Sequence, residues 1–176
     1  MGNESQKNIY KSTIKLIIIF VVLHLILSII GIILFFVTAR YNISTYHPFA
    51  ALYREGNPFL YIICSSILHS FIYLLCGLLT AKMIKITNDK KTIITACVIC
   101  GFLQILSWIF MLTLAFPGNE GIMFAMLLNP FVFWSMNGII NINDLRSVLT
   151  VLYYLLPTIT FFLGIFIYAN RRSRAF

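Results

Sequence analysis

Long uncharged stretches dominate the chain. They cover residues 16–39, 56–81, 92–119, 121–143 and 147–170, and each contains at least 23 residues. A helix that crosses a bilayer needs about 20 predominantly apolar residues. The pattern therefore predicts a membrane protein built from transmembrane helices.

Charges and helix-breaking residues set the limits of the expected helices. The third, for example, begins just after Lys91 and ends by Pro117, where proline and the following glycine stop a helix. We predict an all-α, polytopic integral membrane protein in which residues 1–176 form a single transmembrane domain. Its four transmembrane helices are expected as a bundle at about 16–39, 58–81, 92–117 and 148–169.

The segment 121–140 permits two interpretations. It is apolar enough to cross the membrane, but Asn129–Pro130 interrupts its centre and Asn137–Gly138 lies near its end. We expect an interfacial or re-entrant segment on the outer face, provided that its freed backbone groups are buried against protein or water. The alternative is five transmembrane helices.

The composition supports this class and excludes others. Only 10% of the residues are charged and 60% are hydrophobic, whereas roughly a quarter of an average soluble domain is charged. A cytosolic enzyme, a secreted disulfide scaffold, a disordered tail and a nucleic-acid-binding domain are therefore not expected. The expected surroundings are a lipid bilayer.

The net charge of +8 is distributed in a way that predicts topology. Ten of the 13 basic residues flank the expected spans on one side: Lys7, Lys11, Lys15, Lys82, Lys85, Lys90, Lys91, Arg171, Arg172 and Arg174. Under the positive-inside rule, both termini and the 82–91 loop are cytoplasmic. We expect a multi-pass cell-membrane protein with a secondary contact to anionic lipids. Its isoleucine, lysine and asparagine usage is typical of a low-GC bacterium.

Polar side chains inside the spans form a candidate intramembrane layer. On the second span they recur at spacings of three and four, which places them on one helix face. At about 1.5 Å of rise per residue, the polar side chains of three spans fall near mid-membrane. The candidate residues are His24, Ser66, His69, Tyr73 and Gln104. A proton-responsive or solute-binding layer is one interpretation, and interhelical hydrogen bonding for packing is the other.

Aromatic and asparagine side chains gather in the expected outer segments. They belong either to an interfacial belt or to an outward cap that contacts a partner or closes a cavity. The candidate contacts are Tyr46, His47, Phe49, Tyr53, Asn129 and Pro130.

Signatures of enzymatic chemistry are weak. Cys97 and Cys100 form a C-x-x-C on an expected helix, where cysteines usually serve as packing residues and where no histidine or carboxylate completes a metal site. Ser66 and His69 lie one turn apart without a nucleophile elbow or an orienting carboxylate. We predict no catalytic, cofactor-binding or metal-binding residues.

Two functional hypotheses follow. The first is a small multi-span accessory or interaction protein, such as a transporter-associated subunit or an immunity-type factor. Four helices are few to enclose a permeation path, so association with a second copy or another membrane subunit is expected. The second hypothesis is an oligomeric small-solute or ion transport protein that uses the His/Gln/Ser layer. No nucleic acid or cofactor is expected as a partner.

Overall fold

The computed structural model describes four α-helices. They are α1 (Gly2–Arg40), α3 (Pro58–Ile84), α4 (Lys90–Leu114) and α7 (Val148–Ser173), and they account for every residue that is described. The prediction of an all-helical protein is therefore confirmed for this part of the chain. The outer-face candidates and the 121–140 segment lie outside the described residues, so the choice between four and five crossings stays a prediction.

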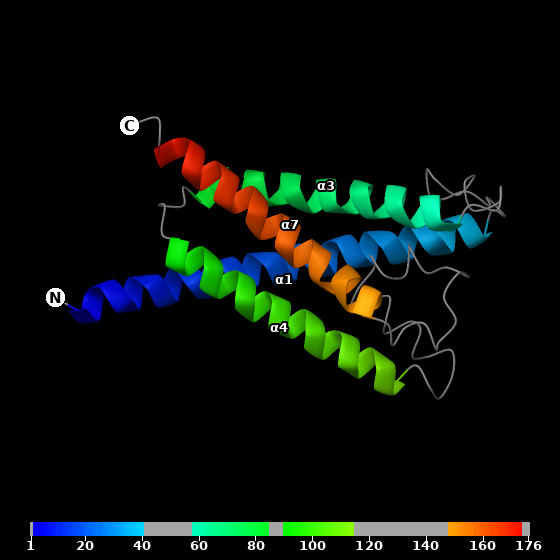
Figure 1. Ribbon diagram of the computed structural model, residues 1–176, viewed down its shortest axis with the longest axis horizontal. Helices are drawn as coiled ribbons and strands as arrows, with labels where there is room; N and C mark the ends of the chain where they lie inside the picture. Colours follow the sequence, from blue (N-terminus) through cyan, green and yellow to red (C-terminus); the bar gives the residue numbers. More distant parts are fainter. Residues whose placement is uncertain (1, 41–57, 85–89, 115–147, 174–176) are drawn as a thin grey trace.

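The four helices alternate in direction. α1 and α4 run from the end that carries the N-terminus towards the opposite end, and α3 and α7 run back, so that both chain ends lie at one end of the molecule (Figure 1). α7 makes the most extensive contacts, against α3 and also against α4, while α1 packs on α4. The N-terminal and C-terminal helices thus belong to one assembly.

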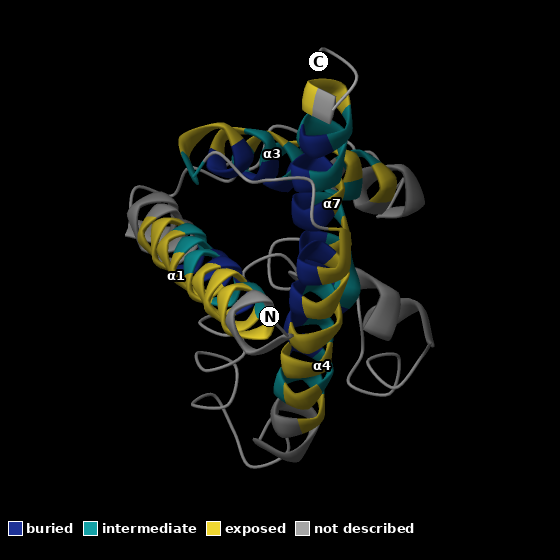
Figure 2. Ribbon diagram, turned by 90° about the vertical axis from the view of Figure 1, so that its left-hand side faces the viewer, coloured by how far each residue is buried: buried dark blue, intermediate teal, exposed yellow. Residues whose placement is uncertain are grey.

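The last helix occupies the centre of this assembly. Its buried positions recur at intervals of three and four residues, as expected for one continuous helical stripe: Tyr154, Pro157, Phe161, Ile165 and Ala169. Figure 2 shows α7 largely buried, whereas the outer faces of α1 and α4 are exposed. Protein packs against α7 on two sides, and Thr158 of this helix is buried there as well.

The outward faces of the other helices are strongly apolar. Exposed side chains include Ile18, Val22, Ile26, Ile29 and Ile33 on α1 alone, and similar rows follow α3 and α4. Contiguous apolar surface on this scale is not stable in water. Three of the helices are long and apolar enough to cross a membrane, over Gln6–Ile30, Ser66–Ile84 and Lys90–Ile109. These features indicate association with a membrane.

Two glycines allow α3 and α7 to approach closely. A Cβ atom added to Gly77 would overlap the backbone carbonyl of Phe161, and one added to Gly164 would overlap the backbone carbonyl of Leu74. Small residues let helix backbones come together and gain van der Waals contact, which is the main attraction between helices in lipid. The pair Gly77 and Gly164 therefore fixes where the two helices cross.

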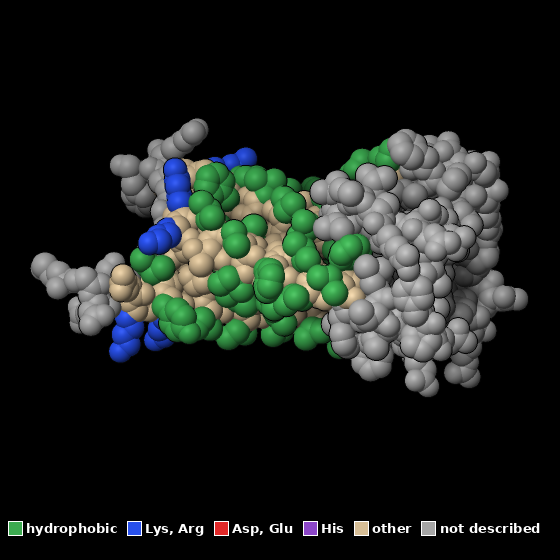
Figure 3. All heavy atoms as spheres, turned by 60° about the horizontal axis from the view of Figure 1, so that its bottom comes forward, with side chains coloured by type: hydrophobic (Ala, Val, Ile, Leu, Met, Phe, Trp, Pro, Cys, Tyr) green, Lys and Arg blue, Asp and Glu red, His purple; other side chains and the backbone are tan. Residues whose placement is uncertain are grey.

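Basic side chains are concentrated at the end where the chain begins and ends. Figure 3 shows lysine and arginine there and apolar side chains covering the middle of the molecule. The described residues of this basic end are exposed: Lys7, Lys11, Lys15, Lys82, Lys90, Lys91, Arg171 and Arg172. The helical arrangement brings together charges that the sequence distributes over four helices.

Candidate functional site

One histidine joins three helices. The Nδ1 atom of His24 on α1 lies 2.6 Å from the hydroxyl oxygen of Tyr73 on α3, and its Nε2 atom lies 3.2 Å from Nε2 of Gln104 on α4. These three side chains are at least 94% buried, with exposed fractions of 6%, 2% and 5%. Of the predicted polar layer, the structure thus brings His24, Tyr73 and Gln104 into one hydrogen-bonded group.

The chemistry of the amide assigns the protons of this group. An amide nitrogen donates and does not accept, so Gln104 donates to Nε2 of His24, and Nδ1–H donates to the Tyr73 hydroxyl oxygen. Turning the amide by half a rotation reverses both bonds, because its oxygen then accepts from Nε2–H and the tyrosine donates to Nδ1. In both arrangements a neutral imidazole has a partner at each ring nitrogen.

A cluster of aromatic side chains packs next to His24, on the side of the hydrogen-bonded group that is nearer the basic end of the molecule. Phe20 stacks on His24 with 5.7 Å between ring centroids, and it also contacts Tyr73, Phe161 and Phe162 at 5.3 to 6.5 Å. Phe161 and Phe162 meet edge to face at 5.2 Å, one of the favourable aromatic geometries. α7 thus adds two rings to the site, so all four described helices contribute to it.

The remaining predicted members of the layer lie along α3. His69 is buried one turn before Tyr73, and Ser66 is half-buried nearly one turn before His69. Both lie on the side of Tyr73 away from the basic end, since α3 finishes at that end. His24 therefore bonds to Tyr73, which lies nine residues from Lys82 as His24 lies nine residues from Lys15, rather than to His69, which lies 13 residues from Lys82.

Two serines near the group hydrogen-bond to their own helices. The Ser28 hydroxyl donates to the His24 backbone carbonyl at 2.7 Å, and the Ser107 hydroxyl donates to the Gln104 backbone carbonyl at 2.8 Å. Such bonds to a carbonyl three or four residues earlier satisfy a hydroxyl without a partner on another helix. The interhelical hydrogen bonds described at this site are therefore those among His24, Tyr73 and Gln104.

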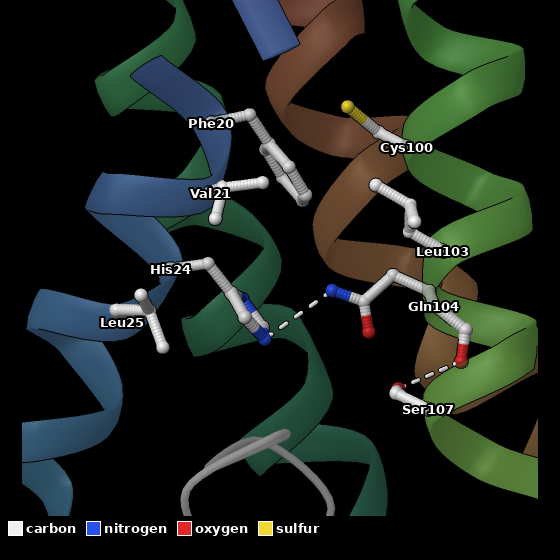
Figure 4. A pocket seen from close by; sticks show the side chains of 8 residues that line it. All are labelled: Phe20, Val21, His24, Leu25, Cys100, Leu103, Gln104 and Ser107. Carbon is white, nitrogen blue, oxygen red and sulfur yellow. Dashed lines mark hydrogen bonds between the residues drawn. The ribbon is translucent and has the colours of Figure 1, made fainter. Parts of the chain in front are cut away.

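A small cavity lies beside the group in the groove between α1 and α4. Its volume is about 180 Å³, and its lining is Phe20, Val21, His24, Leu25, Cys100, Leu103, Gln104 and Ser107 (Figure 4). The floor is formed by buried residues such as His24, Cys100 and Gln104. The rim is formed by exposed Val21, Leu25 and Leu103 on the outward helix faces. The cavity therefore opens sideways between two helices.

The described side chains offer hydrogen bonding and apolar packing at this site. Within the described residues, no group of three or more histidine, cysteine, aspartate or glutamate residues is placed to hold a metal ion. Cys64, Cys76, Cys97 and Cys100 are free thiols, and Cys100 is fully buried at the cavity wall. The site is therefore suited to holding helices together and to admitting a small apolar group.

The three phenylalanines around His24 were not among the site residues predicted from the sequence. Phe20 precedes His24 by four residues, so helical spacing places both on one face of α1, and that signal was present in the sequence. The pairing of Phe20 with Phe161 and Phe162 joins residues far apart in the chain, and no periodicity within one helix predicts it.

A function has to be inferred from this geometry, because comparisons with known proteins give no match. No protein-family model, no curated protein and no solved structure matches the chain.

Proposed function

We propose that this chain is a multi-span membrane protein that works through helix contacts with another membrane subunit or a second copy. A transporter-associated subunit and an immunity-type factor are examples of such a role. The observation that carries the proposal is the use of both ring nitrogens of His24 by the chain's own Tyr73 and Gln104. Polar side chains that hydrogen-bond to one another serve helix packing rather than the binding of a transported solute.

The shape of the site supports the same role. Phe20 and the two rings from α7 fill the space next to His24. The cavity of about 180 Å³ has its exposed rim on the outward faces of α1 and α4. A permeation path would run along the bundle from one end to the other, whereas this opening is lateral. Four helices that leave broad apolar faces uncovered offer surface for a neighbouring helix.

The proposal includes a topology in which both chain ends are cytoplasmic. The basic end carries the N-terminus and C-terminus together, and positively charged ends favour the cytoplasmic side. We expect a green fluorescent reporter fused after Phe176 to fluoresce and a phosphatase fused there to be inactive, because alkaline phosphatase matures only outside the cytoplasm. Active phosphatase would contradict this topology and would favour 121–140 as a fifth crossing.

Two measurements test the functional proposal, the first in intact membranes and the second on purified proteins. Photo-crosslinkers at Val98 and Phe102, on the exposed face of α4, should capture one discrete membrane partner in intact membranes. The identified partner and this chain, purified separately, should then form the complex in lipid nanodiscs. A crosslinker at Ala96, which is fully buried on the same helix, is the matched control.

The contrary result is transport by the chain alone. Proteoliposomes that contain only this protein should show no ion or small-solute flux above empty vesicles. Flux that His24→Leu abolishes, while the variant still inserts and remains folded, would overturn the proposal in favour of an oligomeric transport protein.

A further inference from the structure

The cytoplasmic part of α1 carries three lysines on one stripe. Lys7, Lys11 and Lys15 are four residues apart, and each step of four rotates the position by only about 40° around the helix. All three are exposed, whereas Thr13 and Leu16 on the opposite side are buried against the bundle. The stripe therefore faces away from the protein, towards whatever surrounds the helix.

Helix geometry sets the depth of this stripe. The apolar run of α1 begins at Leu16, directly after Lys15, and Lys11 and Lys7 lie about 6 and 12 Å further out at 1.5 Å per residue. A headgroup layer is roughly 5 to 8 Å thick, being half the difference between the full bilayer and its hydrocarbon core. Lys15 and Lys11 thus lie at headgroup depth, and the long side chain of Lys7 can reach back to it.

The surrounding charge strengthens the attraction for anions. α1 packs on α4, whose first residue is the exposed Lys90. The C-terminal end of α7, with the exposed Arg171 and Arg172, lies at the same end of the molecule. None of the side chains that the structure describes is a carboxylate. In the sequence, Glu4 comes three residues before Lys7 and Asp89 directly precedes Lys90, which makes two negative charges against the eight described basic residues of this end.

We propose that the stripe Lys7, Lys11 and Lys15 binds the headgroups of anionic phospholipids in the cytoplasmic leaflet. The proposal rests on the membrane insertion included in the proposed function. A topology signal needs positive charge near a span, but it does not need that charge on one face that points away from the protein. The outward stripe at headgroup depth is what a lipid contact requires, and each lysine near an anionic surface adds about a fivefold preference.

The experiment compares the full chain with two triple variants in lipid nanodiscs. Lys7→Gln, Lys11→Gln and Lys15→Gln together remove the stripe, and Lys82→Gln, Arg171→Gln and Arg172→Gln remove the same charge elsewhere on the basic end. The nanodiscs contain phosphatidylcholine and phosphatidylglycerol, and native mass spectrometry counts the lipids that remain on the protein. A third variant with arginine at the three stripe positions keeps the charge.

We expect phosphatidylglycerol to be enriched on the wild-type chain and on the arginine variant. The stripe variant should lose about tenfold or more of that enrichment, and the matched control should lose clearly less. Equal loss in both glutamine variants, or equal enrichment in wild type and stripe variant, would overturn the proposal. Displacement by a soluble acidic peptide, with no preference between the two lipids, would assign the stripe to a protein partner and would also overturn it.

Membrane insertion is measured separately on the same samples. Resistance to extraction by alkaline carbonate shows that the chain is integral, whichever lipid it retains. Loss of that resistance would count against the proposed function, whereas an inserted chain without lipid preference would count against the lipid site alone.

Discussion

Replacing Gly77 with alanine is expected to destabilise the protein far more than the same change at Gly101. The new Cβ would meet the backbone carbonyl of Phe161, and a backbone cannot rotate aside as a flexible side chain can. Overpacking of this kind costs about 3 kcal/mol or more when the backbone must shift. Gly164→Ala should behave alike, because its Cβ would meet the Leu74 carbonyl.

Gly101 provides the matched control. It also lies inside a helix, but a Cβ there would be 3.6 Å from Cδ2 of Leu155, an ordinary van der Waals contact. Alanine is a better helix former than glycine by up to about 1 kcal/mol, so Gly101→Ala should be neutral or stabilising. Thermal unfolding in mild detergent and the folded yield of all three variants provide the measurements. A Gly77→Ala protein as stable as Gly101→Ala would contradict the close α3–α7 crossing.

Replacing His24 with leucine is expected to give a smaller loss of stability than alanine at the close-packed glycines, but still a clear one. The substitution removes the partner of the Tyr73 hydroxyl and of the Gln104 amide in a buried setting. Interhelical hydrogen bonds in membranes average roughly 0.6 kcal/mol, but a buried polar group that loses its partner costs about 1 to 3 kcal/mol. We therefore expect His24→Leu to cost about 2 kcal/mol in total.

Two further variants separate hydrogen bonding from volume and burial. His24→Gln keeps a donor and an acceptor and should recover part of the loss. Ser28→Ala removes a hydroxyl that bonds only to the His24 carbonyl on its own helix among the bonds described, so its effect should stay within about 0.5 kcal/mol. Unfolding of the variants in the same detergent provides the comparison. A leucine variant that matches wild type, or one that the glutamine variant does not surpass, would show that the histidine contributes no interhelical bond.

The positions of the helices were largely predictable because apolar runs of this length are typical of membrane-spanning helices. The second and fourth expected spans begin at residues 58 and 148, where α3 and α7 begin. The first differs, because α1 begins at Gly2 rather than near residue 16. Hydrophobicity measures only where a chain enters lipid, whereas the polar residues of the first turns can continue the same helix in the headgroup layer and in water.

The candidate site was predictable in its parts but not in its pairings. Helical spacing placed His69 and Tyr73 on one face of α3, and both are buried in the structure. The sequence placed His24, His69 and Gln104 at overlapping depths on three helices, whereas the hydrogen bond from His24 to α3 goes to Tyr73. Tyr73 and His24 each lie nine residues from a lysine of the basic end, Lys82 and Lys15, whereas His69 lies 13 residues from Lys82, so the observed pair is the one with the closer match in depth.

The central position of α7 has a consequence for the order in which the protein is assembled. α7 is the last of the described helices along the chain, and its buried stripe faces α3 and α4 rather than the surroundings. A polypeptide emerges from the ribosome N-terminus first, so the earlier helices must wait with the contact surface around Gly77 uncovered until the C-terminal helix arrives. Synthesis of α7 is then the step that joins these described helices, and a chain truncated before Val148 would leave the binding surface for α7 on α3 open to lipid or to a neighbouring protein.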